Sequence, residues 1–287
     1  MRWWRAPAKI NLTLRVLGRR SDGLHLIRSL VAFGEPCDWL GFEPAPTLEL
    51  DIEGPAAAQS GPTENNLVLK AAKALSSETP NLRLGRFRLV KRLPAAAGIG
   101  GGSADAAAAL RALAYANGLP LGDPRLRSAG LAAGADVPVC LLAKARVVEG
   151  VGEQLGPCLL LPPIVALLVN PGVAVSTRSV FKALKPNLAS PSEPDLLSAA
   201  PVRTDPLTLG SLAEEGNDLE APAVELAPIV EELLGRLAHL PGARFSRMTG
   251  SGATCFAAFE DSEQAERGRR IIVDERPHWW VKATRLH

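Results

Sequence analysis

The feature that most constrains the fold is a glycine-rich stretch between a strand-like and a helix-like segment. Four of the five residues from Gly98 to Gly102 are glycine, which costs backbone entropy. Residues 87–94 before it have strand character, and residues 103–116 after it have high helix propensity. A strand, glycines and a helix start together leave bare N–H groups at the positive end of a helix dipole, where phosphate binds. The stretch therefore predicts an anion-binding loop, with Ser103 capping the helix or donating to the same phosphates.

Two familiar glycine loops do not fit this stretch. A Walker A loop needs Lys-Ser or Lys-Thr after its last glycine, whereas Ser103-Ala104 follow Gly102 here. The dinucleotide pattern G-x-G-x-x-G needs a third glycine where Ser103 stands. On the glycines alone, a flexible turn that lets a helix pack closely remains an alternative.

The charge and cysteine content exclude several classes of protein. The net charge is only +2, from 32 basic and 30 acidic residues interspersed along the chain, so we predict no nucleic-acid partner. The four cysteines (Cys37, Cys140, Cys158 and Cys255) are scattered without metal-ligand spacing, which predicts reduced thiols. Residues 155–177 carry no charge, but the four prolines among them would repeatedly break a membrane-spanning helix. We expect no membrane association and a cytoplasmic location.

The distribution of periodic segments indicates an α+β fold with two domains. Strands and helices are mixed without regular alternation, and 287 residues suffice for two domains. The proline-broken region 156–163 suggests a division into domains 1–155 and 156–287. The sequence predicts strands over 10–16 and 164–169, a helix over 65–75 capped by Thr63 or Asn65, and a helix over 179–183. It also predicts a loop over 185–206 and a long helix near 222–237.

Three further segments could work with the glycine loop. "PAKINLTL" places Lys9 and Asn11 on one face of a strand, because alternate side chains share a face. "GADVP" holds Asp136 among small residues, and "MTGSGATCF" supplies a second glycine-rich bend at 250–252. Each segment also has a plainer interpretation taken alone: an exposed edge lysine, a turn aspartate and an ordinary hairpin.

Taken together, the N-terminal strand, the central glycine loop and the C-terminal glycine bend resemble the three motifs of the GHMP kinases, in the same order. That family is named for galactokinase, homoserine kinase, mevalonate kinase and phosphomevalonate kinase. The resemblance implies an ATP-dependent phosphotransferase with a two-domain architecture, an ATP-binding domain at 1–155 and an active site in the cleft between the domains. Another small-molecule kinase, for homoserine or a sugar, and a catalytically dead homologue that only binds ligand are the alternatives.

Further stretches, "PAKINLTLRVLGRRSDGLH", "PTENNLVLKAAKAL", "VEGVGE" and "GNDLE", are similar to one branch of the family. That branch phosphorylates the 2-hydroxyl of a cytidine diphosphate-linked methylerythritol in non-mevalonate isoprenoid biosynthesis. The resemblance implies ATP and Mg²⁺ as cofactors, with no Mg²⁺ ligands assigned, and a small-molecule partner for a monomer or homodimer.

The resemblance also implies roles for individual residues. Lys9 and Asp136 match the catalytic pair, and we expect them to meet at the tip of the triphosphate. The positions that match ATP contacts are Pro94, Ala95, Ala96, Ala97, Gly98, Ile99, Gly100, Gly101, Gly102, Ser103, Ala104, Asn65, Asn66 and Lys91. The positions that match substrate contacts are Asn11, Leu24, His25, Thr177 and Phe181, with His25 bonding the cytosine. The family has tyrosine where Leu24 stands, so this chain lacks one aromatic ring for stacking on the base.

Overall fold

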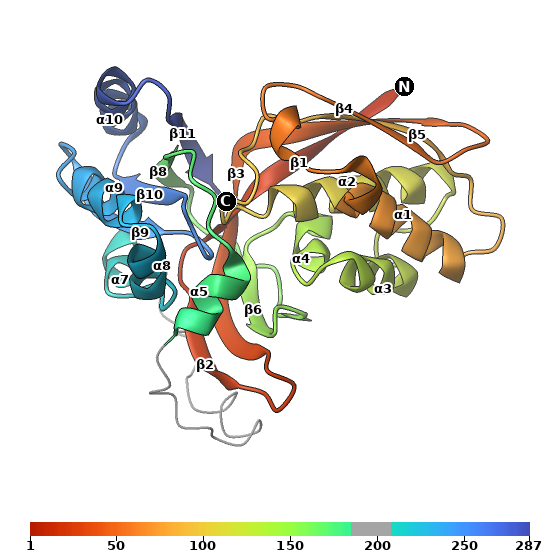
Figure 1. Cartoon of the computed structure of the whole chain (residues 1–287), viewed down its shortest axis with the longest axis horizontal. Helices are drawn as coiled ribbons and strands as arrows, with labels where there is room; N and C mark the ends of the chain where they lie inside the picture. Colours follow the sequence, from red (N-terminus) through yellow and green to blue (C-terminus); the bar gives the residue numbers. More distant parts are fainter. Residues whose placement is uncertain (185–207) are drawn as a thin grey trace. The chain divides into compact units, whose positions relative to one another are not determined.

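The computed structural model describes residues 1–184 and 208–287, which form two compact units (Figure 1). The predicted loop at 185–206 lies outside the described residues. Unit 1 comprises Met1–Lys9, Phe33–Ala96 and Gly100–Lys144, and unit 2 comprises Ile10–Ala32, Ala97–Ile99 and Ala145–His287. The chain therefore enters each unit more than once. The division into domains 1–155 and 156–287 stays a prediction.

Unit 1 pairs a small sheet with a group of helices. The second half of β3 pairs antiparallel with β5 from Trp39 opposite Val90, and β5 pairs parallel with β4. Helix α2 contacts α1, α3 and α4, and its residues Ala104–Ala109 are buried, because alanines let neighbouring helices approach closely. Unit 1 contains most of β1 (Arg2–Asn11) and the second half of β3 (His25–Pro44). Its other elements are β4 (Glu49–Glu53), β5 (Gly85–Val90), the short 3-10 helices Ala57–Gln59 and Thr63–Asn65, α1 (Leu67–Glu78), α2 (Gly101–Ala116), α3 (Pro124–Ala133) and α4 (Val137–Leu142).

Unit 2 is built on an antiparallel sheet in the order β11-β8-β10-β9. Strand β8 is buried along nearly all its length, which confirms the strand predicted from the apolar run at 164–169. This sheet consists of β8 (Ile164–Asn170), β9 (Ala243–Met248), β10 (Cys255–Phe259) and β11 (Trp280–Leu286). Strands β2 (Arg15–Arg19) and β6 (Arg146–Gly150) pair with the first half of β3, and β7 (Gln154–Leu155) pairs with β6. The helices of unit 2 within the described residues are α5 (Thr177–Ala183), α7 (Leu209–Ala213), α8 (Glu220–Leu226), α9 (Ile229–Ala238) and α10 (Ser262–Glu275).

Several local predictions were wrong for identifiable reasons. The long helix near 222–237 is two helices, because Pro228 lacks an N–H and disfavours helical backbone at Ala227, where α8 ends. The strand expected over 10–16 is divided between β1 and β2. Helix α1 is capped by Asn66, whose side chain accepts from Val68 N, rather than by Thr63 or Asn65.

Across residues 1–184 and 208–287, no helix combines the length and the apolar character that crossing a bilayer would need.

Candidate active site

An ion pair between Lys9 and Asp136 is the first element of the site. Lys9 lies on β1, Asp136 directly precedes α4, and the Lys9 Nζ–Asp136 Oδ2 distance is 2.7 Å. The side chain of Lys9 is only 6% exposed, whereas that of Asp136 is 41% exposed. The carboxylate is therefore open to a reactant while the ammonium is held beneath it. The predicted meeting of these two residues is present, and their catalytic roles stay a prediction.

Gly100 brings the start of α2 against Lys9. A Cβ atom at Gly100 would lie 3.2 Å from Lys9 Cβ, and the φ angle of +63° also favours glycine. Gly100 is the N-cap of α2 and makes no side-chain cap bond, so Ser103 is not the cap that the sequence suggested. The first-turn N–H groups of α2 are thus left without a capping side chain beside a lysine, an arrangement suited to phosphate oxygens.

Beneath this helix start lies a buried group of three ionisable side chains. Lys91 Nζ donates to Asp38 Oδ2 at 2.5 Å and to Asp105 Oδ2 at 2.7 Å, and each of the three residues is at most 4% exposed. The other oxygen of Asp38 accepts from Leu93 N at 2.8 Å, so the same carboxylate holds the chain where it enters the loop. Lys91 was predicted to contact ATP. Its ammonium points instead to two aspartates, and an ATP contact through another of its atoms stays a prediction.

The protonation of this group follows from its burial. Burial raises the pKa of Asp105 to about 8, and repulsion from Asp38 adds to the rise, while Lys91 opposes it. Burial alone would lower the pKa of Lys91, but the charges of Asp105 and Asp38 outweigh it and raise that pKa. Asp105 Oδ1 is buried without a hydrogen-bond partner among the described residues. Asp105 is therefore the neutral acid of the group at neutral pH, and Lys91 stays an ammonium.

In unit 2, the loop residue Gly98 packs against the turn between β9 and β10. Gly98 has a φ of +74°, and a Cβ atom there would collide with the carbonyl oxygen of Thr249. Reciprocally, a Cβ atom at Gly250 would lie 2.6 Å from Gly98 O. For Gly98, the close approach that glycine permits is thus to protein backbone. At this position the structure supports close packing, the alternative to phosphate binding that the sequence left open.

Asn11 is held by the same turn. Its backbone N donates to Thr249 Oγ1 at 2.9 Å, and its Nδ2 donates to Ser29 Oγ at 2.7 Å. Asn11 is 3% exposed, and its Oδ1 has no partner among the described residues. The side chain is fixed through its amide nitrogen, and its buried carbonyl oxygen is left as an unused acceptor.

The predicted cytidine contacts gather around α5. His25 and Phe181 stack with ring centroids 4.9 Å apart, and Thr177 Oγ1 lies 2.8 Å from Ser251 Oγ in the β9–β10 turn. Burial, and then the charge of Arg19, lower the pKa of His25, so its imidazole is neutral at pH 7 and can both donate and accept. Leu24 beside it is 51% exposed.

Two of the remaining predicted ATP contacts, Asn66 and Ala95, make local bonds within unit 1. Asn66 caps α1, while Asn65 is exposed. Ala95 N donates to Gln59 Oε1 at 3.1 Å, and Ala96 is exposed with a φ of +49°. Whether these positions contact ATP stays a prediction.

Three residues of the site were missed in the sequence: Asp38, Asp105 and Thr249. Asp105 had a usable signal, since it is the one charged residue in the run from Gly98 to Leu110, which is otherwise glycine, alanine, serine and aliphatic residues. A lone acid in an apolar helix needs a buried partner. Thr249 lies in the quoted segment "MTGSGATCF", but no pattern linked it to Asn11, which is 238 residues away.

The sequence of the chain matches models of the GHMP kinase family and is similar to curated kinases. A family model described as "GHMP kinases N terminal domain" matches residues 66–144, and one described as "GHMP kinases C terminal" matches residues 196–276. A 4-diphosphocytidyl-2-C-methyl-D-erythritol kinase of Methylorubrum extorquens (strain PA1) is 53% identical, over 98% of each chain.

Two solved structures resemble the chain as a whole. A crystal structure of 4-(cytidine 5'-diphospho)-2C-methyl-D-erythritol kinase has a TM-score of 0.77 and 33% identity, covering 99% of both chains. A homoserine kinase from Cytophaga hutchinsonii has a TM-score of 0.69 at 17% identity, covering 99% of this chain and 93% of the other, and is thus similar in fold alone.

The raised pKa of Asp105 predicts a specific pH dependence of stability. In the unfolded chain this carboxyl ionises near its ordinary value of 3.8, whereas the folded protein keeps the proton up to about pH 8. The folded state therefore binds more protons between these values, and the free energy of unfolding should fall as pH rises from 5 to 8. Urea unfolding at pH 5, 6, 7 and 8 should show a shallower fall for D105N, which has no proton to lose.

The exposed Asp51 on β4 supplies the matched control, and D51N should keep the wild-type slope. Equal slopes for D105N and wild type would contradict the assignment of the buried proton to Asp105.

Proposed function

The chain belongs to the GHMP kinase family, and from that premise we propose that it transfers the γ-phosphoryl group of ATP to the 2-hydroxyl of 4-diphosphocytidyl-2-C-methyl-D-erythritol, a step of non-mevalonate isoprenoid biosynthesis. The single observation that carries the chemistry is the Lys9–Asp136 pair, with its buried ammonium and open carboxylate beside the start of α2. The substrate follows from whole-chain similarity to kinases of that name.

Phosphoryl transfer requires positioning of the reactants and neutralisation of charge that develops on the phosphate. The uncapped N–H groups at the start of α2 would bind phosphate oxygens, since they carry the positive end of the helix dipole. Lys9, adjacent to Gly100, would neutralise charge on the transferring group and orient the carboxylate. Asp136 would accept the proton of the substrate hydroxyl as its oxygen attacks phosphorus. A carboxylate is a weak base for an alcohol, so proton transfer would run late.

Mg²⁺ is the proposed companion of the triphosphate, where it neutralises charge on the phosphate oxygens. This ion keeps several waters and takes few protein carboxylates when phosphates are present. Among the described residues, no group of three or more His, Cys, Asp and Glu could hold a metal ion. Asp136, whose side chain is 41% exposed, is the carboxylate of the proposed site that is open to an ion.

Uncharged side chains would recognise the cytidine end of the substrate. The uncharged imidazole of His25 can donate to one polar atom of cytosine and accept from another, and the Phe181 ring can cover the base. Asn11 Oδ1, which has no partner among the described residues, would accept from a hydroxyl of the methylerythritol group. We also propose a cytoplasmic location and a monomeric or homodimeric state.

The two alternatives make different use of these residues. A homoserine or sugar kinase needs the phosphate loop but not a base-binding His25 and Phe181, and the homoserine kinase fold match is only 17% identical. A catalytically dead homologue has no need for a close Lys9–Asp136 pair.

The experiment that tests the proposal is a screen for phosphate transfer from labelled ATP. The acceptors offered are 4-diphosphocytidyl-2-C-methyl-D-erythritol, homoserine, galactose and mevalonate, each with Mg²⁺. We expect a phosphorylated product from the first acceptor alone. Phosphorylation of another acceptor would assign the chain to a different branch of the family. If none of the four acceptors is phosphorylated, the result would favour the homologue that only binds ligand.

Leu24 predicts weaker base stacking than an aromatic residue would give at this position. An aliphatic side chain covers a base without aromatic stacking, which is worth about 1–3 kcal/mol per base. The L24Y variant should therefore bind the cytidine-bearing substrate roughly five- to a hundredfold more tightly by calorimetry. The L142Y variant adds a tyrosine at a comparably exposed leucine at the end of α4, and should bind as wild type does. Unchanged or weaker binding by L24Y would show that Leu24 does not face the base.

A further inference from the structure

The segment Gly216–Glu220, "GNDLE", belongs to the family resemblance but has no part in the chemistry described so far. It follows α7, and its last residue, Glu220, is the first residue of α8. Its residues bond to two segments that are distant in sequence: Leu14–Val16, and the end of β9 with the turn that follows it. Both segments belong to unit 2 with it.

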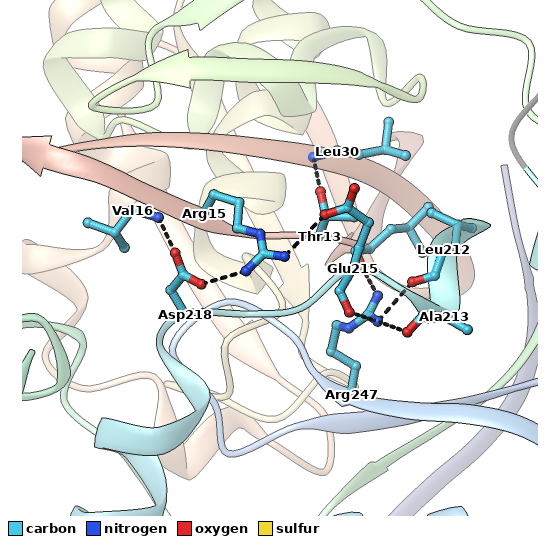
Figure 2. A network of polar contacts seen from close by, with 10 residues as sticks. Thr13, Arg15, Val16, Leu30, Leu212, Ala213, Glu215, Asp218 and Arg247 are labelled. Carbon is cyan, nitrogen blue, oxygen red and sulfur yellow. Dashed lines mark hydrogen bonds and ion pairs between the residues drawn. The ribbon is translucent and has the colours of Figure 1, made fainter. Parts of the chain in front are cut away.

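On one side, the segment is fixed to the N-terminal part of unit 2 (Figure 2). Leu14 N donates to Gly216 O, and Asp218 N donates to Leu14 O, both at 2.9 Å. Asp218 Oδ2 accepts from Val16 N at 2.7 Å, and Asp218 Oδ1 accepts from Arg15 Nη1 at 3.1 Å. The backbone and one carboxylate therefore hold Gly216–Asp218 in a fixed register with Leu14–Val16.

A buried arginine reinforces this attachment. Arg247, on β9, is 4% exposed; its Nη1 donates to Leu12 O at 2.6 Å and its Nη2 to Leu212 O at 2.8 Å. Figure 2 shows the same guanidinium reaching the backbone of Glu215. One planar cation thus satisfies carbonyls of the N-terminal segment and of the chain that leads into Gly216.

On the other side, Asn217 holds the β9–β10 turn. Its Nδ2 donates to Met248 O and to Gly250 O, each at 2.8 Å, and its Oδ1 accepts from Leu219 N at 3.0 Å. Glu220 Oε2 accepts from Met248 N at 2.9 Å. Asn217 is 8% exposed, so water cannot readily replace these bonds.

This turn carries the contacts that place two site residues. Thr249, between the two carbonyls that Asn217 binds, accepts from Asn11 N, and Gly250 packs against Gly98 of the glycine loop. A shift of the Met248–Gly250 backbone would therefore displace Asn11 and Gly98 together.

We propose that Asn217 is a positioning residue for phosphoryl transfer, a role that rests on the proposed function. Its amide fixes the backbone of Met248–Gly250, so that Thr249 holds Asn11 and Gly250 holds Gly98. The two N–H donors of one amide carry this role. An isosteric carboxylate would face the same two carbonyl oxygens without a proton to donate and would push the turn away.

The test compares N217D and N217A with wild type, using the full chain. We expect kcat to fall at least tenfold in both variants and N217D to be no better than N217A, although aspartate leaves no cavity. Binding of CMP, measured by calorimetry, should stay within twofold of wild type, because the contacts of Asn217 do not include His25 or Phe181. Amide hydrogen exchange at Asn11 and at 249–252 should become faster.

The I272A variant is the matched control for lost stability. Ile272 is fully buried in the same unit on α10, and I272A should keep kcat per folded enzyme within threefold and leave exchange at Asn11 unchanged. The T249V variant removes the acceptor for Asn11 N and should reproduce the fall in kcat, so the proposal stays testable if N217D does not fold.

The proposal is overturned if N217D keeps kcat within threefold of I272A, or if its exchange at Asn11 and 249–252 matches that of I272A. If N217D does not fold, a T249V kcat within threefold of wild type overturns it equally. Should the wild type transfer no phosphate, the proposed function fails, and the exchange comparison then decides by itself whether Asn217 holds the turn.

Discussion

The ion pair between Lys9 and Asp136 is the interaction on which the rest of the site depends. A buried ammonium is stable only beside a negative charge, and here the carboxylate comes from a segment 127 residues away. Because Lys9 also packs against Gly100, the same side chain fixes where α2 begins. The acid, the cation and the helix N-terminus are thus brought together by one side chain.

The glycine loop serves packing as well as its proposed anion binding. Gly98 and Gly100 both have positive φ angles, and at each a Cβ atom would meet protein, the Thr249 backbone at one and Lys9 at the other. By contrast, a Cβ atom at Gly101 or Gly102 would make only ordinary contacts, at 3.6 Å or more. Each interpretation of the stretch therefore applies to a different part of it. Close packing explains Gly98 and Gly100, whereas the N–H groups at the start of α2 are left open for the proposed anion binding.

Sequence patterns predicted the elements whose signal is local and missed those fixed by distant contacts. The apolar run at 164–169 was enough to identify a buried strand, because burial on both faces needs no alternation. The break at Pro228 was missed because apolar periodicity continues across it. The Lys9–Asp136 pair came from family resemblance, since no spacing relates residues so far apart, and the bonds of Lys91 to Asp38 and Asp105 had no pattern that joined the three.

The most direct test of the account is a double-mutant cycle in kcat on Lys9 and Asp136. If the two side chains act as one unit, K9M and D136N should each lower kcat by roughly 10²–10⁴, and the double variant should be about as slow as the slower single one. ATP affinity should change little in D136N, since that variant keeps the shape of the side chain. Effects that multiply in the double variant, or a D136N enzyme with most of its turnover, would contradict the central role of this pair.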